Sequence, residues 1–378
     1  MKILITGGHL TPALSVIEQL PRDAHVLYVG RKYALEGDKA FSLEYQTILN
    51  MHIPFAELKT GRLQRKLTIH TIPSLLRLPL GLAQAMKIVS SYKPDVILSF
   101  GGYVSVPVAF AAKLKGIPIV IHEQTLEAGL ANRVIAPFAS KICISWQTSA
   151  KFFPKNKTIL TGNPAVATIL DHIKPTKKQA SILPKIVIVG GSLGSHAINL
   201  LVEGALEKLT TEFHILHQTG DAKQFGDFDR LVAKKNTLEK KLQDRYLPIK
   251  FIDPKDIISA FQQADLVVTR AGINTITTLL LLNKPAFVIP LPVSQNNEQR
   301  KNGLFLKEHG LGEVVSQDSL TAEKFFNYIH AMIKNKDKYI NTKELSELLI
   351  HKKSAQKIID IVSYEQKQAS QKKTSKDN

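Results

Sequence analysis

Residues 185–195 read KIVIVGGSLGS, an apolar and β-branched run that leads directly into a pair of glycines. The run 185–189 predicts a buried strand, and apolar residues recur at helical spacing from residue 198 to residue 209. A glycine turn between a strand and a helix lets the backbone approach a phosphate, which the free N–H groups of the helix start can bind. Ser192 adds a hydroxyl to this turn. A tight turn needed only for packing is the alternative interpretation.

The same alternation extends in both directions from this turn. Further short apolar runs lie at 3–5, 24–29, 95–98, 118–121, 141–144, 158–160, 213–216, 249–252, 265–268 and 286–289. Strands that alternate with helical segments predict parallel sheets with right-handed crossovers. The expected fold class is therefore α/β, with two doubly wound parallel-sheet domains in tandem. The Pro- and Lys-bearing stretch 162–184 is the expected link between them.

Composition agrees with two globular domains. The chain has 378 residues, of which 44% are hydrophobic and 22% charged, which excludes disordered and collagen-like classes. Its net charge of +18 favours an anionic partner, whether nucleic acid, an acidic membrane or a phosphorylated ligand. Cys143 is the single cysteine, so no intrachain disulfide can form, and a small buried hydrophobe is expected there. No leader and no apolar run of about 18 residues occurs, so a soluble, cytoplasmic protein is expected.

The first predicted strand also runs into a glycine pair, Gly7-Gly8, which His9 follows. This turn lacks the G-x-G-x-x-G spacing, and Arg31-Lys32 stand where a dinucleotide fold places an acidic ribose ligand. An NAD enzyme is therefore disfavoured, and an NADP-like site stays open. At a strand end His9 is placed to act as a general base near neutral pH, although an isolated histidine is more often structural.

Other motifs exclude several classes of site. Residues 101–105 and 122–125 both follow predicted strands of the first domain, so their side chains are expected at one face. The second segment is no H-E-x-x-H zinc site, because its fifth position is Leu126. Metal binding at residues 227–229 is disfavoured because no strand precedes them. A Walker A motif and nucleic-acid recognition signatures are absent from the sequence.

A basic and apolar segment lies between Glu57 and Asp95, where no acidic residue occurs. Seven lysines and arginines alternate there with leucines, isoleucine and methionine, a pattern that can lie on an anionic bilayer surface. A stripe that faces the core and carries a solvated basic edge is the alternative. Pro73 and Pro79 argue against one continuous interfacial helix.

Several short motifs follow one another in the order typical of one family. They are GGYVS at 101–105, HEQ at 122–124, AGL at 128–130 with Asn132, GNP at 162–164, GGS at 190–192 with Gly194 and Asn199, HQTG at 217–220, Phe251-Ile252, Arg270 with Gly272, and NN at 296–297 with Gln299 and Asn302. Over nearly its whole length the chain thus resembles the MurG family, the peptidoglycan glycosyltransferases that build lipid II.

The resemblance implies a GT-B fold, in which two Rossmann-like domains face each other across a cleft. Residues 1–163 would form the acceptor-binding, membrane-side domain and residues 164–344 the UDP-sugar-binding domain. A helix at about 345–365 would pack back on the first domain. Residues 366–378 carry four lysines and no large apolar residue, so a disordered basic tail is expected.

The implied reaction is inverting transfer of N-acetylglucosamine from UDP-N-acetylglucosamine to the 4-hydroxyl of lipid-linked N-acetylmuramyl-pentapeptide, in peptidoglycan synthesis for cell-wall biogenesis, cell shape and cell division. The partners implied are the UDP-sugar, a polyprenyl-diphosphate-linked muramyl-peptide and an anionic membrane surface, without nucleic acid. The location would be peripheral, on the cytoplasmic face of the cell membrane. A helix N-terminus would stabilise the leaving diphosphate, so no metal or cofactor is required. Two alternatives are another glycolipid acceptor and a non-catalytic relative that binds UDP-sugar.

The resemblance also implies a role for individual residues. Those expected in catalysis are His9 and Glu123, and those expected to bind the acceptor are Gly8, Tyr103, His122 and Asn132. Those expected to bind the donor are Ser192 and the neighbouring backbone of Gly191 at the diphosphate, the Ile252 backbone at uracil, Arg270 on the nucleotide side, and Gln299 with Asn302 at the sugar. Asn199 is also expected to bind the donor.

Four positions differ from the family's pattern. The first loop is three residues shorter than Gly-Gly-Thr-Gly-Gly-His, and Thr125 and Val166 replace an Asn and an Arg. Thr278 stands where the family has a ribose-binding Glu, and one hydroxyl cannot replace a carboxylate that binds two hydroxyls. Loss of one charged hydrogen bond costs about 1.5–3 kcal/mol, which predicts donor affinity lower by roughly tenfold to a hundredfold.

Overall fold

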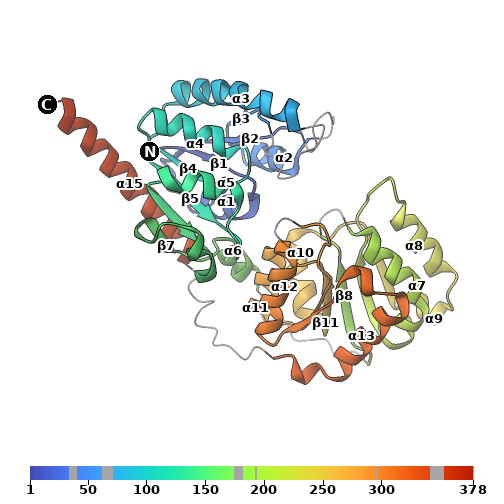
Figure 1. The fold of residues 1–378 in the computed structure, drawn as a ribbon. Coiled ribbons are helices and arrows are strands. Elements are labelled where there is room, and N and C mark those ends of the chain that lie inside the picture. Colours follow the sequence, from blue (N-terminus) through green and yellow to red (C-terminus); the bar gives the residue numbers. More distant parts are fainter. Residues whose placement is uncertain are drawn as a thin grey trace. The chain divides into compact units, whose positions relative to one another are not determined.

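The computed structural model (Figure 1) describes residues 1–33, 41–61, 71–173, 182–191, 194–294, 297–340 and 353–377. The chain divides into two compact units. Unit 1 contains Met1–Thr168 and Leu348–Asn378, and unit 2 contains Ile169–Glu347. Each unit is built on one parallel sheet with helices against it, so the predicted α/β class with two Rossmann-like domains is confirmed.

Unit 1 contains a seven-stranded parallel sheet in the order β3-β2-β1-β4-β5-β6-β7. The strands are β1 (Lys2–Thr6), β2 (His25–Gly30), β3 (Phe55–Glu57), β4 (Val96–Ser99), β5 (Ile119–Glu123), β6 (Lys141–Ile144) and β7 (Thr158–Leu160). The helices are α1 (Leu10–Ile17), α2 (Leu43–Asn50), α3 (Thr71–Tyr92), α4 (Ser105–Leu114), α5 (Leu130–Ile135) and α15 (Ser354–Asp377), and α6 (Ala165–His172) crosses the boundary between the units. Short 3₁₀ turns lie at Ala136–Phe138, Gln147–Phe152 and Lys155–Lys157. Strand order reverses between β1 and β4, the place where such sheets bind ligands.

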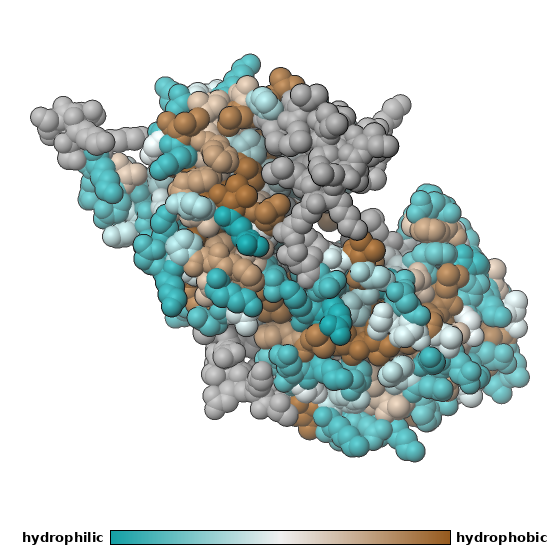
Figure 2. Space-filling model, viewed as in Figure 1, coloured by the Kyte–Doolittle hydropathy of each residue, from teal (hydrophilic) through white to brown (hydrophobic). Residues whose placement is uncertain are grey.

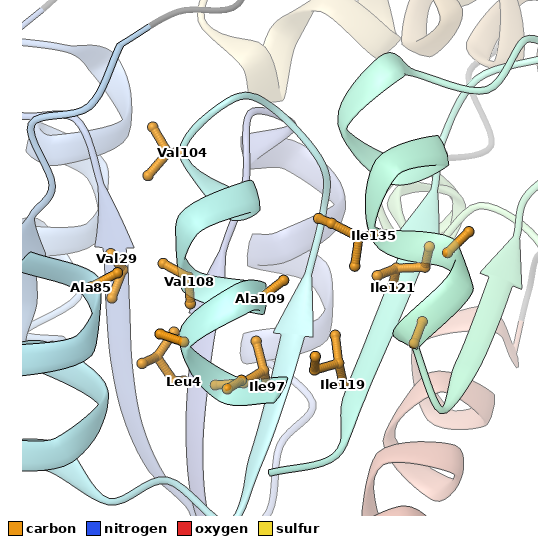
Figure 3. Packing of buried hydrophobic residues seen from close by; sticks show 14 of the residues in the cluster. Leu4, Val29, Ala85, Ile97, Val104, Val108, Ala109, Ile119, Ile121 and Ile135 are labelled. Carbon is orange, nitrogen blue, oxygen red and sulfur yellow. The ribbon is translucent and has the colours of Figure 1, made fainter. Parts of the chain in front are cut away.

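Both faces of this sheet are buried, which explains the continuous apolar runs in its strands. Leu4 points to one face and packs in a cluster with residues of α3, α4 and α5 (Figure 3). Its neighbours Ile3 and Ile5 point to the opposite face and pack with residues of α1, α2 and α15. Cys143 lies in that second cluster, fully buried, and burial raises the pKa of its thiol to about 12. The expected buried hydrophobe at Cys143 is confirmed.

The last helix returns to unit 1. Ala355, Ile358, Ile359 and Val362 recur at helical spacing and are buried in the α1 and α2 cluster, so α15 packs as the resemblance implies. The expected disordered tail is wrong for residues 366–377, because α15 continues to Asp377. Those residues are mostly Gln, Lys, Ser and Ala, and several are good helix formers. Adding residues to an existing helix costs little once its packed part is formed.

Unit 2 contains a six-stranded parallel sheet in the order β10-β9-β8-β11-β12-β13. The strands are β8 (Lys185–Val189), β9 (His214–Gln218), β10 (Tyr246–Ile249), β11 (Leu266–Thr269), β12 (Ala286–Val288) and β13 (Gly312–Val314). The helices are α7 (His196–Glu212), α8 (Asp227–Asn236), α9 (Lys240–Gln243), α10 (Pro254–Gln263), α11 (Ile273–Leu282), α12 (Glu298–Glu308) and α13 (Ala322–Lys334), with 3₁₀ turns at Gln317–Ser319 and Lys336–Lys338. Strand order reverses between β8 and β11, and α7 and α13 cover one face.

One strand lies three residues earlier than its apolar run predicts. The sequence places a strand at 249–252, whereas β10 spans Tyr246–Ile249. Pro248 lacks an N–H, but β10 is the edge of the sheet, where that donor is not needed on the outer side. The buried Tyr246 anchors the strand in the core.

The carboxyl group of Glu44 lies near the end of β2, where it is largely removed from solvent. Glu44 on α2 lies against the backbone of Gly30, where an added Cβ would come within 1.9 Å of its Oε1 atom. No described residue hydrogen-bonds that oxygen. Burial raises the pKa of Glu44 to about 7, against the smaller lowering effects of the Arg31 charge and the Tyr28 hydroxyl. The folded protein therefore favours the protonated form of Glu44.

The free energy of unfolding is expected to fall as pH rises from about 4.5 to about 7. The pKa of Glu44 in the folded chain exceeds the ordinary value of 4.5, so the folded state holds the proton more strongly and loses stability between about pH 4.5 and pH 7. Glu44→Gln removes the charge, and its advantage in free energy of unfolding over the wild type should grow by up to about 3 kcal/mol between these values. Urea unfolding at pH 4.5 and pH 8 measures this. Glu18→Gln, at an exposed carboxylate, is the control, and an equal advantage at both pH values would contradict the prediction.

Candidate functional site

Two glycine turns interlock at the switch point of unit 1. Gly8 N donates to Gly101 O at 2.9 Å, and Phe100 N donates to Thr6 O at 2.7 Å. Gly102 has φ +80°, and a Cβ there would lie 2.8 Å from Gly8 N. The turns after β1 and β4 therefore touch through their backbones, and a side chain at either glycine would separate them.

His9 is held by the second of these turns. It is the N-cap residue of α1, it is half-buried, and its Nδ1 lies 3.1 Å from Phe100 O. A carbonyl only accepts hydrogen bonds, so the neutral ring carries its proton on Nδ1 and its lone pair on Nε2. The imidazole is thus oriented to take up a proton at Nε2. Tyr103, from the same turn as Gly102, is half-buried and packs against the core cluster of α3 and α4.

Glu123, at the end of β5, is turned into the protein. It is 1% exposed. Thr125 N and Oγ1 donate to its Oε1 at 3.0 and 2.8 Å, and Gly129 N and Asn132 Nδ2 donate to its Oε2 at 2.8 and 3.0 Å. Because both oxygens are occupied, these contacts do not support the expected catalytic role. They give Glu123 the role of holding the 125–129 turn and the start of α5. Thr125 thereby keeps a polar contact despite replacing an Asn.

Glu123→Gln tests this positioning role. A glutamine keeps one carbonyl oxygen but presents an N–H₂ group to either Gly129 N or Thr125 N, so a donor faces a donor in a buried place. The free energy of unfolding is expected to fall by about 1–3 kcal/mol, the cost of a buried donor without an acceptor. Chemical unfolding of the variant measures this. An unchanged unfolding midpoint together with lost activity would show instead that Glu123 acts on a reactant.

His122 and Asn132 complete the same network. His122 is buried, and its Nε2 lies 3.3 Å from Gly162 O and 3.2 Å from Ser145 Oγ, so this nitrogen is engaged within unit 1. Asn132 Nδ2 also donates to His122 O at 3.1 Å. The Oδ1 atom of Asn132 is buried without a hydrogen-bond partner in the described chain, beside Gly101. A buried amide oxygen of this kind can accept a hydrogen bond from a ligand hydroxyl.

In unit 2 the turn after β8 has the geometry that the sequence predicts. Gly191 has φ +96° and Gly194 φ +77°, and a Cβ at Gly194 would lie 1.9 Å from Thr219 O. Ser195 is the N-cap of the 17-residue helix α7, and its hydroxyl accepts from Ile198 N at 3.5 Å. The N–H groups and positive dipole end of α7 therefore lie at the switch point. Ser192 lies outside the described residues.

Arg270, directly after β11, is a buried cation at the same switch point and is 8% exposed. Its Nη1 donates to the carbonyl oxygens of Ile289 and Pro290 at 3.1 and 3.2 Å, and its Nη2 donates to Ser195 Oγ at 2.6 Å and Gln317 Oε1 at 2.7 Å. All four acceptors are neutral, and no carboxylate of the described ranges pairs with it. Burial lowers the pKa of Arg270, but a guanidinium stays charged. Ser195 closes the GGSLGS turn, but nothing in the sequence shows that its hydroxyl meets Arg270, and Gln317 stands in none of the motifs.

The turn after β11 is fixed by residues expected at the sugar. Asn302 is fully buried and its Nδ2 donates to Ala271 O at 3.0 Å, while no described residue hydrogen-bonds its Oδ1. Gln299 Oε1 accepts from Ala271 N at 3.3 Å and Leu291 N at 2.9 Å, while its side chain stays half-exposed. The Thr278 hydroxyl donates to Asn274 O within α11 at 2.9 Å and is therefore already engaged.

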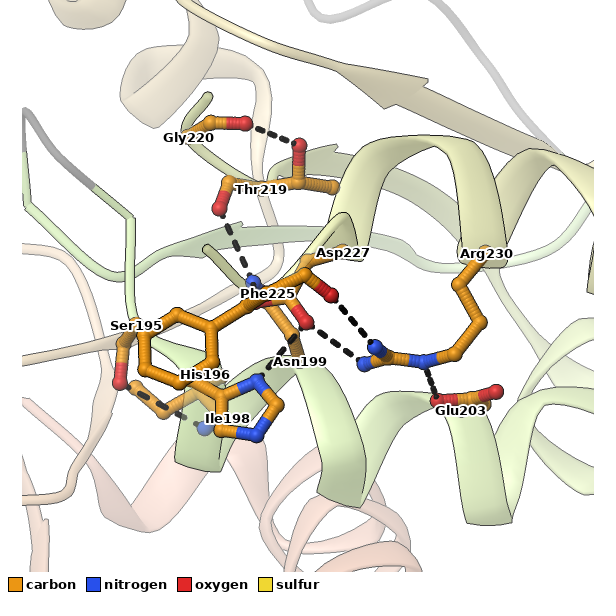
Figure 4. Close-up of polar contacts among 10 residues, drawn as sticks. All are labelled: Ser195, His196, Ile198, Asn199, Glu203, Thr219, Gly220, Phe225, Asp227 and Arg230. Atoms are coloured by element: carbon orange, nitrogen blue, oxygen red, sulfur yellow. Dashed lines mark hydrogen bonds and ion pairs between the residues drawn. The ribbon is translucent and has the colours of Figure 1, made fainter. Parts of the chain in front are cut away.

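Asn199 belongs to a polar cluster behind the α7 N-terminus (Figure 4). Its Nδ2 donates to Thr219 O at 2.9 Å and to Asp227 Oδ2 at 2.7 Å. Asp227 also accepts from His196 Nδ1 at 2.8 Å and Arg230 Nη2 at 2.6 Å. Burial alone would raise the pKa of Asp227, but these three donors together lower it. Asn199 therefore holds α7 against the turn after β9 through contacts within unit 2.

Ile252, expected at uracil, lies beyond the end of β10 with its side chain buried. Its N–H donates to Gln218 Oε1 at 3.1 Å. The expected backbone donor is therefore occupied in this structure. Gln218 lies within the HQTG motif, but the sequence alone predicts no role for it. Within the described ranges, no group of three His, Cys, Asp or Glu side chains could hold a metal ion.

Comparisons with known proteins cover most of the chain. The glycosyltransferase family 28 N-terminal domain matches residues 6–144, and the glycosyltransferase family 28 C-terminal domain matches residues 185–361. A protein of Clostridium botulinum (strain Alaska E43 / Type E3) is 33% identical over 90% of this chain and 92% of its own length. It is named UDP-N-acetylglucosamine--N-acetylmuramyl-(pentapeptide) pyrophosphoryl-undecaprenol N-acetylglucosamine transferase. A protein of the same name from Clostridium perfringens (strain 13 / Type A) is 31% identical over 96% of this chain and 97% of its own length.

Solved structures share the fold. MurG of Acinetobacter baumannii superposes with a TM-score of 0.71 at 24% identity, over 96% of this chain and 99% of that chain. UDP-GlcNAc 2-epimerase of Neisseria meningitidis, bound to UDP-GlcNAc, superposes with a TM-score of 0.59 at 14% identity, over 95% and 99% of the two chains. Chains with two Rossmann-like units thus include MurG and an epimerase, and the fold alone does not select a reaction.

Proposed function

Because this chain belongs to glycosyltransferase family 28, we propose that it transfers N-acetylglucosamine from UDP-N-acetylglucosamine to the 4-hydroxyl of lipid-linked N-acetylmuramyl-pentapeptide. This reaction completes lipid II for peptidoglycan synthesis. The proposal rests on relatives at 31–33% identity over 90% or more of the chain, whose names state this transfer.

The observation that carries the proposal is the buried Arg270. A cation that hydrogen-bonds only neutral oxygens remains uncompensated, and it lies beside the N-terminus of α7 and the Gly190–Gly191 turn. Each of these features favours an anion at the switch point. A diphosphate supplies that charge in the ground state and gains more of it as a leaving group. Gln299, whose Nε2 is not engaged by any described residue, would reach the sugar.

The chemistry requires one proton acceptor. We assign it to His9 in unit 1, because its Nδ1 contact with Phe100 O orients an Nε2 lone pair. The acceptor O4 attacks C1 of N-acetylglucosamine, the bond from C1 to the phosphate oxygen breaks, and configuration inverts from α to β. The O4 proton passes to His9 Nε2, and UDP leaves with the bonding electron pair against α7 and Arg270. The free Asn132 Oδ1 would accept a hydrogen bond from the acceptor in unit 1.

Transfer assays test the reaction. Radiolabelled UDP-N-acetylglucosamine is supplied to the intact protein with lipid I in membranes, and the disaccharide product is expected to be β-linked. A parallel assay offers other polyprenyl-linked and diacylglycerol-linked glycolipids. Transfer only to one of these would replace the acceptor in the proposal. UDP binding without transfer to any acceptor would favour the non-catalytic alternative and overturn the enzyme assignment.

We further propose that unit 1 binds the cytoplasmic face of the cell membrane through α3 and α4, which pack on each other. Leu80, Phe110 and Leu114 on these helices are 68%, 42% and 69% exposed. Exposed lysines accompany them at positions 87, 113 and 115. Figure 2 shows hydrophobic residues gathered on the face of unit 1 that carries α4. Exposed apolar residues with a basic rim suit an anionic bilayer surface. Within the part of the chain that the structure describes, no helix is long and apolar enough to cross a bilayer.

Leu80→Glu combined with Leu114→Glu is expected to weaken vesicle binding at least tenfold, because each change replaces membrane-buried apolar surface with a charge that anionic lipid repels. Sedimentation with phosphatidylcholine–phosphatidylglycerol vesicles measures the effect. Leu247→Glu is the matched control, since Leu247 is 56% exposed in unit 2. Equal binding by the double variant and the control would place the membrane surface elsewhere.

A further inference from the structure

A buried hydroxyl in unit 1 reaches the turn that carries His9. Tyr28 belongs to the apolar run of β2 and is fully buried on the face of the sheet that packs with α1, α2 and α15. Its ring stacks on Phe55 of β3, with the ring centroids 5.9 Å apart. A buried phenol needs a hydrogen-bond partner, and this hydroxyl donates to Gly7 O at 3.3 Å. Of the described residues, no other donates to that carbonyl. Tyr28 therefore ties β2 to the turn after β1.

The peptide group between Gly7 and Gly8 is held at both of its ends. Its carbonyl accepts from Tyr28, and its N–H donates to the turn after β4 at 2.9 Å. Because both residues are glycines, hydrogen bonds rather than side chains must fix its orientation. The same backbone rests on Phe100, since a Cβ at Gly7 would lie 2.7 Å from the Phe100 Cβ atom. His9 follows directly, and its Nδ1 contacts Phe100 O. The orientation of this peptide group therefore helps to set where His9 leaves the turn.

The carboxyl group of Glu44 competes for the same hydroxyl. Gly30 lies two residues beyond Tyr28, on the same face of β2, and a Cβ there would lie 1.9 Å from Glu44 Oε1. That oxygen is buried, and no described residue donates to it. Burial raises the pKa of Tyr28, and the neighbouring Glu44 carboxyl raises it further. The single proton of the Tyr28 hydroxyl therefore has two acceptors within reach, Gly7 O and the Glu44 carboxylate.

The protonation state of Glu44 decides between these acceptors. A neutral carboxyl can donate its own proton to the phenol oxygen, which leaves the phenol proton for Gly7 O, whereas a carboxylate accepts the phenol proton itself. Burial raises the pKa of Glu44 to about 7, so both forms occur near neutral pH.

The described charges around Glu44 come from the strands that pack against α2. Arg31, directly after β2, lowers the pKa of Glu44, but less than burial raises it. Lys32 instead lies over the aromatic rings at positions 33, 41 and 45, with its Nζ atom 5.5 Å from their centroids. Glu57 of β3 forms an ion pair with Lys59 at 3.8 Å. The residues that α1 and α15 bury in this cluster are apolar, so Arg31 is the described cation that acts on Glu44.

We propose that Tyr28 is a positioning residue for His9, because its hydroxyl holds the Gly7 carbonyl while Glu44 is neutral and releases it when Glu44 is ionised. The inference rests on the proposed function, because it takes His9 as the proton acceptor of the transfer. Release of the carbonyl leaves the peptide group before Gly8 with one of its two hydrogen bonds, so His9 is placed less well for the reaction. Turnover is therefore lost as Glu44 ionises, whereas the donor residues of unit 2 are unaffected.

Single-turnover transfer with saturating donor, at pH 6 and at pH 8.5, tests the positioning role. Tyr28→Phe removes one hydroxyl from a packed ring and is expected to lower turnover about threefold to tenfold at pH 6, the value of one hydrogen bond, with UDP affinity unchanged. At pH 8.5 the variant and the wild type should differ little, because the wild-type hydroxyl has left Gly7 O. Glu44→Met removes the competing acceptor and should exceed the wild-type turnover at pH 8.5 by a similar factor. Tyr92→Phe is the matched control, since Tyr92 donates to His25 O at the opposite end of the sheet.

The nitrogen chemical shift of Gly8 measures the same hydrogen bond without enzyme activity, because an amide nitrogen responds to hydrogen bonding at the carbonyl of its own peptide group. The full-length protein, with isotope-labelled glycine, is titrated in a His9→Asn background, which removes the neighbouring ring that also titrates. The Gly8 signal is expected to shift with a midpoint near pH 7, the pKa of Glu44. Tyr28→Phe and Glu44→Met should each abolish this step.

The two measurements separate the proposal from the enzyme assignment. Equal turnover of Tyr28→Phe and Tyr92→Phe at pH 6, or a Gly8 step that persists in Glu44→Met, would overturn the positioning role. Weaker UDP binding with unchanged turnover in Tyr28→Phe would overturn it as well. A protein that transfers no sugar but shows the Tyr28-dependent Gly8 step would sink the proposed function and leave the control of the Gly7 carbonyl in place.

Discussion

Arg270→Met lowers donor-dependent transfer by about two to three orders of magnitude, the effect expected when one preorganised charged donor is removed from a leaving group. The variant loses the only buried guanidinium that the described residues place between Ser195 and the turn after β12. Without it the N-terminus of α7 remains as the positive feature that the described residues place at this switch point. The dissociation constant of UDP is expected to rise in parallel, because part of this charge already acts in the ground state.

Steady-state kinetics with varied UDP-N-acetylglucosamine and calorimetry with UDP measure the two effects of Arg270→Met. Arg270→Lys keeps the charge without the fork geometry and should give an intermediate loss. Arg245→Met is the matched control, since Arg245 donates to the Thr210 and Thr211 carbonyls at the opposite end of α7. If Arg270→Met and Arg245→Met bind UDP equally well, Arg270 does not bind the diphosphate.

His9→Asn is expected to reduce the turnover number by about a hundredfold to ten-thousandfold, the usual contribution of a positioned general base. Asparagine can still donate to Phe100 O but cannot accept a proton at pH 7, so the turn after β1 is kept while the proton acceptor is lost. UDP affinity is expected to stay at the wild-type value, because the donor residues belong to unit 2.

Single-turnover transfer with saturating donor measures the His9→Asn effect on chemistry. His25→Asn is the control, because His25 is exposed at the opposite end of the unit 1 sheet. If His9→Asn retains more than about a tenth of the wild-type rate, the loss lies below the range that a general base supplies. The base would then be another group, and His9 would serve only to hold the turn.

Much of the fold could be predicted from sequence because its signals are local. Strands buried on both faces are continuous β-branched runs, and the 185–189 run and its glycine pair predict β8 and the turn after it directly. Elements with weak local signals were missed. β3 and β13 have three residues each, and β10 begins before its apolar run because an edge strand tolerates Pro248.

The direction in which a site residue points could not be predicted from sequence. Glu123 stands within the HEQ motif, yet only the folded turn shows that Thr125, Gly129 and Asn132 use both its oxygens. Arg270 and Ser195 are 75 residues apart, and their hydrogen bond exists only because β8 and β11 are neighbours. Gln218, the last residue of β9, likewise hydrogen-bonds both Gly191 O and Ile252 N because β9 lies between β8 and β10.

The return of α15 to unit 1 has a consequence for how this chain is made. The cluster that covers one face of the first sheet includes Ala355, Ile358 and Val362, so the half synthesised first lacks part of its interior until α15 has been synthesised. At about 5–20 residues per second, the intervening half takes on the order of 10–40 s to emerge from the ribosome. During that interval the nascent first half exposes the apolar residues that α15 later covers, and the second half can fold before it. A chaperone that holds this surface would raise the yield of native protein, and a stop codon before residue 354 would leave the first half prone to aggregation.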